Sequence, residues 1–152
     1  MSDPIIVLKK LKSLNKSQDT RIALYQEFEE AYQDYLRDKC PTEQYYSICK
    51  IVTEGFQEVS LEIQAIEKEL TEVCQRPDLS SLVRQLQQAE KEKLNHTAHL
   101  QIYTIESKKG DKDYDTAIDE SKNGLSNALT NIQSIWDEIR SEIMELSYSV
   151  EE

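Results

Sequence analysis

The pattern of apolar and polar positions is clearest over residues 45–73. Apolar side chains recur there at alternating spacings of four and three residues, and no polar residue interrupts the series. This spacing places them on one side of an α-helix, because a strand would alternate every second residue. We therefore predict a helix of about 30 residues, about 45 Å long, whose apolar stripe is buried against other helices. The stripe consists of Tyr45, Cys49, Val52, Phe56, Val59, Ile63, Ile66, Leu70 and Val73.

The segment before this stripe has the same period. A first helix is predicted to begin near Pro4, with Asp3 as its N-cap, and to end before a turn at residues 38–41, where Pro41 disfavours helical geometry in the preceding residue. Polar residues 15–17 leave open whether this segment is one helix or two. Its inward positions are Ile5, Leu8, Leu11, Leu14, Gln18, Tyr25, Phe28, Tyr32 and Tyr35.

Two more helices are predicted after the second turn, at residues 75–78. Asp78 is the expected cap of the third helix, and residues 107–115 form the longest connection before a C-terminal helix over residues 116–148. The inward positions of the third helix are Leu79, Leu82, Val83, Leu86, Thr97, Leu100 and Tyr103. Those of the C-terminal helix are Ile118, Ser121, Leu125, Ala128, Ile132, Ile135, Ile139, Ile143 and Leu146.

Four helices with short connections favour antiparallel neighbours. We predict an all-α fold, an up-down-up-down bundle of four long helices with coiled-coil-like packing that forms one domain over residues 1–152. The alternative is an elongated three-helix core whose fourth helix docks on a partner. The oligomeric state stays open, because heptads pair within one chain or between chains.

The regular pattern is interrupted in the third helix and in the second. The inward series of the third helix weakens at Ala89 or Glu90 and at Lys93 or Leu94. This indicates a partner site, a local splay of the bundle or, as we favour, a lysine whose stem packs while its amine reaches water. Gly55 lies inside the second helix, where glycine costs about 1 kcal/mol relative to alanine. Close approach of a neighbouring helix would explain it, and so would a tolerated surface position.

Composition and charge narrow the classes of function. The net charge is −11, and residues 41–75 carry −5 and residues 111–152 carry −8. Proteins that bind duplex DNA directly usually present a dense basic surface, so direct nucleic-acid binding is not expected. The chain has no apolar run long enough to span a bilayer and no secretory signal, and its three cysteines cannot all pair. These features predict reduced thiols and an intracellular location, in the nucleus or the cytoplasm.

The motifs that would support chemistry are incomplete. Residues 111–119 resemble the start of a calcium loop, but Thr116 replaces the required glycine and Lys122 the final glutamate. His96 and His99 share a helix without the ligands a bundle metal site needs, and no glycine-rich phosphate loop or nucleophile turn is present. We predict no enzyme activity, no metal and no cofactor.

The middle of the chain resembles the "Required for excision 1-B" family of helical proteins linked to DNA excision repair. The resemblance covers about residues 20–102. It is carried by Tyr25-x-x-Phe28-Glu29-Glu30, Val52-x-x-x-Phe56-x-x-Val59-Ser60 and Ile66-Glu67-x-x-Leu70, and most strongly by Arg76-Pro77-Asp78-Leu79 with the run from Leu86 to Gln101 that contains Glu90-Lys91-x-Lys93-Leu94.

This resemblance implies a role in repair but no catalytic residues. We expect a non-enzymatic helical adaptor that acts through protein–protein contacts, with a candidate partner surface formed by Arg76, Arg84, Lys91 and Lys93, the positive residues of the third-helix region. A solvated helix face is the other interpretation of these four residues. The alternative function is a structural coiled-coil subunit of a cytoskeletal or trafficking assembly.

Overall fold

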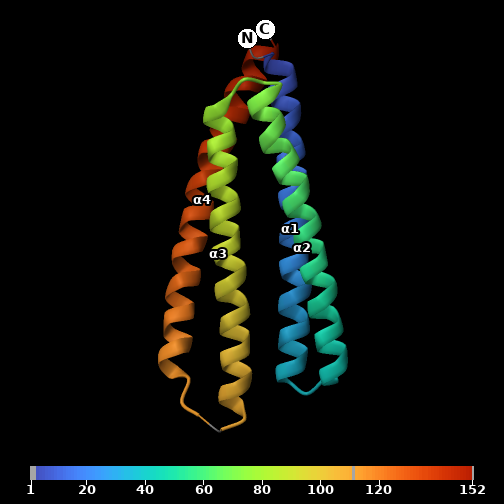
Figure 1. The fold of residues 1–152 in the computed structure, drawn as a ribbon, viewed down its shortest axis with the longest axis vertical. Helices are drawn as coiled ribbons and strands as arrows, with labels where there is room; N and C mark the ends of the chain where they lie inside the picture. Colours follow the sequence, from blue (N-terminus) through green and yellow to red (C-terminus); the bar gives the residue numbers. More distant parts are fainter. Residues whose placement is uncertain (1–2, 111, 152) are drawn as a thin grey trace. The chain divides into compact units, whose positions relative to one another are not determined.

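The computed structural model describes residues 3–110 and 112–151 and contains four long helices (Figure 1). These are α1 (Pro4–Leu36), α2 (Thr42–Glu72), α3 (Pro77–Lys108) and α4 (Asp115–Glu151). No strand occurs in the described ranges, so the predicted all-α class is confirmed. The up-down-up-down order of all four helices stays a prediction. The chain divides into a first unit, up to Ser81 and from Glu142 onward, and a second unit, Leu82–Ser141.

Helix α1 begins where the sequence predicts. Asp3 Oδ1 accepts a hydrogen bond from the N–H of Ile5 at 2.9 Å, and Pro4 occupies the first turn. The helix continues through residues 15–17 without a break, so this segment is one helix. It ends before Asp38, which has a positive φ of 57° and lies in the turn that leads to α2.

Within the first unit, α1 and α2 lie side by side and run in opposite directions (Figure 1). Residues further along α1 contact residues earlier in α2, as expected for antiparallel helices. Lys10 forms an ion pair with Glu69, and the Ser17 hydroxyl donates to Glu62 Oε2 at 3.1 Å. Further along, Tyr25 packs on Phe56 and Tyr35 stacks on Tyr45, each with ring centroids 4.6 Å apart.

The apolar stripe of α2 is largely buried, as predicted. Seven of its nine residues are buried, including Ile63 and Leu70 with no exposed surface, and Cys49 is half-buried. Val73 is instead 59% exposed, because α2 ends at Glu72 and the chain turns Cys74 inward. Ile5 is also wrongly assigned to the inside. It is 61% exposed, and Val7 is buried in its place.

Gly55 illustrates the close packing of α1 on α2. A Cβ built at Gly55 would lie 2.8 Å from Leu24 Cδ2, so the glycine meets a neighbouring helix. The close approach of a neighbouring helix therefore explains this glycine, and a tolerated surface position does not.

The second unit contains most of α3 and α4, which also contact each other in antiparallel order. His96 of α3 lies against Gly124 of α4, and the rings of Tyr103 and Tyr114 stack with centroids 5.8 Å apart. Helix α4 extends beyond the predicted residues 116–148. It begins at Asp115, whose N–H donates to Asp113 Oδ1 at 2.9 Å. Its buried side chains in this unit are Ser121, Ala128, Ile132, Ile135, Trp136 and Ile139.

Candidate protein-interaction surfaces

The turn between α2 and α3 fixes the position of Arg76. Gln75 adopts a positive φ of 54°, and the N–H of Arg76 donates to the carbonyl of Leu70 at 2.8 Å, a bond that closes the end of α2. Pro77 then starts α3, a position that suits proline because its missing N–H would have no helical partner. Asp78, which was predicted to cap α3 from outside, therefore lies inside its first turn.

Arg76 is held by two carboxylates. Its Nε and Nη2 donate to Asp78 Oδ1 and Oδ2 at 3.0 and 2.9 Å, and Nη2 also donates to Glu142 Oε1 of α4 at 2.7 Å. The hydrogen bonds from Arg76 lower the pKa of Asp78, and those carboxylates raise the pKa of Arg76. The guanidinium thus joins the start of α3 to α4 within the first unit, so its charge is engaged inside the protein.

The other three residues of the predicted basic surface lie on α3 in the second unit. Arg84 and Lys91 are exposed and seven residues apart, which places them on the same side of the helix. Lys93 is two residues further on and half-buried, so it points to a different side. The structure therefore brings Arg84 and Lys91 together on one face of α3, separate from Lys93.

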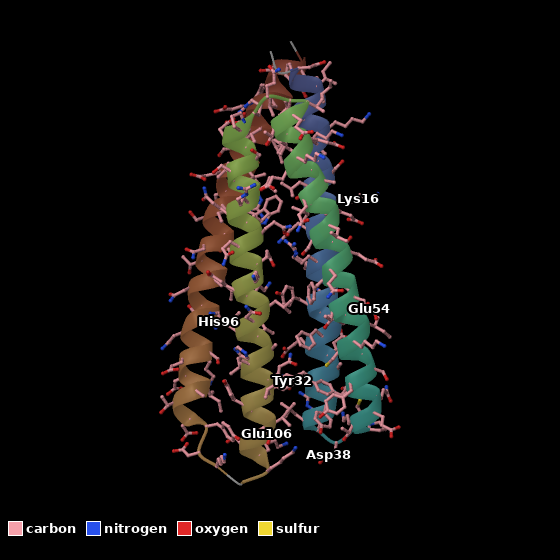
Figure 2. All side chains as sticks on the ribbon, in the orientation of Figure 1. Lys16, Tyr32, Asp38, Glu54, His96 and Glu106 are labelled. Atoms are coloured by element: carbon pink, nitrogen blue, oxygen red, sulfur yellow. The ribbon has the colours of Figure 1, made fainter. Side chains whose placement is uncertain are left out.

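Acidic side chains dominate the outer face of α2. Glu43, Glu54 and Glu58 are exposed, on the side opposite the buried stripe, and Figure 2 shows Glu54 on this helix. Two exposed lysines, Lys50 and Lys68, share this face. The mixed charge is typical of a solvated helix face.

A small pocket lies where α3 meets α4 in the second unit. It encloses about 170 Å³ and is lined by His96, His99, Tyr103, Ala117, Glu120 and Ser121. His96, labelled in Figure 2, packs against Gly124, and the rings of His99 and Tyr103 lie with centroids 5.9 Å apart. Within residues 3–110 and 112–151, no three His, Cys, Asp or Glu side chains are grouped to hold a metal ion. Asp111, the first residue of the calcium-like stretch, lies outside those ranges.

The three cysteines are free thiols in protected positions. Cys40 and Cys74 are buried and Cys49 is half-buried. Burial raises the pKa of the thiols of Cys49 and Cys74, which keeps them protonated and weakly nucleophilic. Burial also raises the pKa of the Tyr45 hydroxyl next to Cys49. Tyr45 and Cys49 lie near the start of α2, whereas Cys74 follows the opposite end of that helix. No helix in the described part of the chain is long and apolar enough to cross a membrane.

Sequence reasoning missed three features of these surfaces. The pairing of Arg76 with Glu142 joins residues 66 apart, and nothing in the local sequence signals it. The contact between His96 and Gly124 depends on the register of α3 against α4, which the sequence does not give. The exposure of Met144 and Tyr148 could have been predicted from the sequence, since both lie outside the inward series of the C-terminal helix.

Comparison with known protein families agrees with the resemblance seen in the sequence. The model of the family described as DNA repair REX1-B matches residues 9–104, more than half of the chain. This chain belongs to the DNA repair REX1-B family. The match includes α2, the Arg76 turn and most of α3.

This chain is also similar to a protein of fission yeast. It is 33% identical over 128 residues to the heterochromatin silencing protein rss1 of Schizosaccharomyces pombe, across 84% of this chain and 93% of that protein. Because 128 aligned residues cannot fit within residues 1–104, at least 24 of them lie beyond residue 104. The similarity thus continues beyond the family match into α4.

Proposed function

We propose that this protein is a non-enzymatic adaptor in DNA excision repair that acts through protein–protein contacts. Membership of the DNA repair REX1-B family supports the repair context. The observation that carries the adaptor role is the exposed pair Arg84 and Lys91 on one face of α3, in a protein with a net charge of −11. Two cations on the same helix face can select an acidic partner and speed its association, since charge complementarity mainly sets specificity and association rate.

The fission-yeast relative extends the context. Its name places it in heterochromatin silencing, and a protein that serves both settings would meet its partners on chromatin. We therefore expect the protein to work in the nucleus. Direct binding to DNA is not part of the proposal, because two surface cations offer few of the phosphate contacts that duplex binding requires.

Charge reversal on α3 tests the adaptor role. We expect the double variant Arg84→Glu and Lys91→Glu to lose its main partners, at least tenfold in quantitative affinity capture from ultraviolet-irradiated cells. The matched control is Lys50→Glu with Lys68→Glu, which changes the net charge equally on an exposed face of α2. Circular dichroism verifies that both variants keep their helices.

Two results would contradict the proposal. One is that the α3 double variant retains every partner that the wild type captures. The other is steady association of the wild type with filaments or vesicles and no nuclear recruitment after damage, which would favour a structural coiled-coil subunit.

A further inference from the structure

The end of α4 carries an apolar pair on its outward side. Met144 and Tyr148 are 61% and 66% exposed and four residues apart, so their side chains are neighbours on one face of the helix. Leu146, on the opposite side, is buried at 7% exposure. The packing of α4 within the first unit is therefore already satisfied by a different face, and Met144 and Tyr148 are not required for it.

Exposed apolar side chains are concentrated in this part of the first unit. Among the described residues, twelve large apolar side chains are exposed, and six of them belong to the start of α1, the residue that follows α2 and the end of α4. Figure 1 shows the start of α1 and the end of α4 at the same end of the molecule. Single exposed apolar residues are normal, whereas a local concentration marks an interaction site. The six are Ile5, Ile6, Val73, Met144, Tyr148 and Val150.

The charges of α4 closest to Tyr148 are acidic, and the nearest cation on the helix, Arg140, is paired with Asp137. Glu145 and Glu151 are exposed, and each lies three residues from Tyr148 on the helix. Glu142 is already paired with Arg76. No Lys, Arg or His follows Arg140 in the sequence, so no side chain of this segment neutralises Glu145 and Glu151. An apolar centre with an acidic border is complementary to a segment that has an apolar anchor and basic neighbours.

We infer that Met144, Glu145, Tyr148 and Glu151, together called the α4 end face, bind a short basic amphipathic segment of a partner protein. The thioether of Met144 adapts to differently shaped apolar side chains, and the Tyr148 ring offers a large contact area with a polar tip. Lysine or arginine side chains of the partner would pair with Glu145 and Glu151. The inference is independent of the proposed function, which uses the basic face of α3 and an acidic partner.

A second copy of this chain fits the face less well. Two copies with a net charge of −11 repel each other. A stable dimer buries about 800 Å² per partner, so self-association would have to use surface well beyond Met144 and Tyr148. A basic segment gains from the same charge that opposes self-association.

Fluorescence anisotropy of the full chain tests the inference with defined probes. The binding probe is a labelled Lys/Leu peptide of about 18 residues, roughly five helical turns, with leucines spaced three and four apart. A Glu/Leu peptide with the same pattern tests the charge, and a Lys/Ser peptide tests the apolar anchor. The site variant is Met144→Ser with Tyr148→Ser. Its matched control is Ile51→Ser with Leu61→Ser, which removes two side chains of similar exposure (61% and 65%) from acidic α2.

We expect the Lys/Leu peptide to bind the wild type and the α2 control equally, and to bind the site variant at least tenfold more weakly. Replacing Glu145 and Glu151 with glutamine should weaken binding and reduce its dependence on salt. The inference is wrong if the Lys/Leu peptide does not bind, if the Glu/Leu or Lys/Ser peptide binds as well, or if the site variant matches the wild type. Sedimentation of the wild type as a dimer that the site variant abolishes would also overturn it, by assigning the face to self-association.

Discussion

The guanidinium of Arg76 donates three hydrogen bonds to two carboxylates, one two residues away and one 66 residues away. Replacing Arg76 with methionine keeps most of the side-chain volume but removes all three bonds. We expect the free energy of unfolding to fall by about 1–2 kcal/mol, since hydrogen bonds to charged groups are strong but Asp78 is well exposed to solvent. Chemical denaturation measures this change.

Glu142→Gln is the companion variant, and the double variant should lose less stability than the sum of the two single losses, because both remove the same contact. An Arg76→Met protein as stable as the wild type would show that the ion pairs contribute nothing.

The pH dependence of the Arg76 effect follows from the lowered pKa of Asp78. The carboxylate stabilises the fold above its unfolded pKa of about 4, and this contribution disappears as the pH falls through the lower folded value. The stability difference between the wild type and Arg76→Met should therefore be largest at neutral pH and shrink below about pH 4. A difference that grows with acidity would contradict this assignment.

The contact between His96 and Gly124 predicts a coupled pair of substitutions. A Cβ at Gly124 would overlap the His96 imidazole, so Gly124→Ala should destabilise the protein although alanine favours helix. In a His96→Ala background the overlap disappears, and the same Gly124→Ala change should stabilise by up to about 1 kcal/mol. Thermal unfolding of the four proteins measures the coupling, and additive effects would contradict the contact.

At the scale of the helices, the sequence predicts most of what is regular. The three- and four-residue spacing of apolar side chains identifies all four helices, and the prolines at residues 41 and 77 mark the starts of α2 and α3 within a residue. The assignments fail at helix ends, as at Ile5 and Val73. A heptad pattern does not record where a helix stops, and the last residues of a stripe therefore lose their neighbours.

The candidate surface was only partly predictable at this scale. Helical spacing alone places Arg84 and Lys91 on one face and Lys93 on another. The engagement of Arg76 depends on Glu142, which the fold brings from α4, so a list of nearby basic residues could not separate it from the others. Local charge identifies candidate residues, whereas tertiary contacts such as the one between Arg76 and Glu142 become visible only in the fold.

At the scale of the whole molecule, each of the two units has its own buried side chains, and exposed charged side chains of both signs lie on the helices. Arg84 and Lys91 form the positive face on α3, and Glu145 and Glu151 border the apolar pair on α4. The cysteine thiols are protected, and the described residues include no metal-binding group.

The most direct measurement is the removal rate of ultraviolet photoproducts from the DNA of cells that lack this protein. We predict slow removal in those cells, full rescue by the wild type and by the Lys50→Glu, Lys68→Glu control, and no rescue by Arg84→Glu, Lys91→Glu at equal abundance. Normal removal without the protein, or full rescue by the α3 variant, would contradict an adaptor role in excision repair.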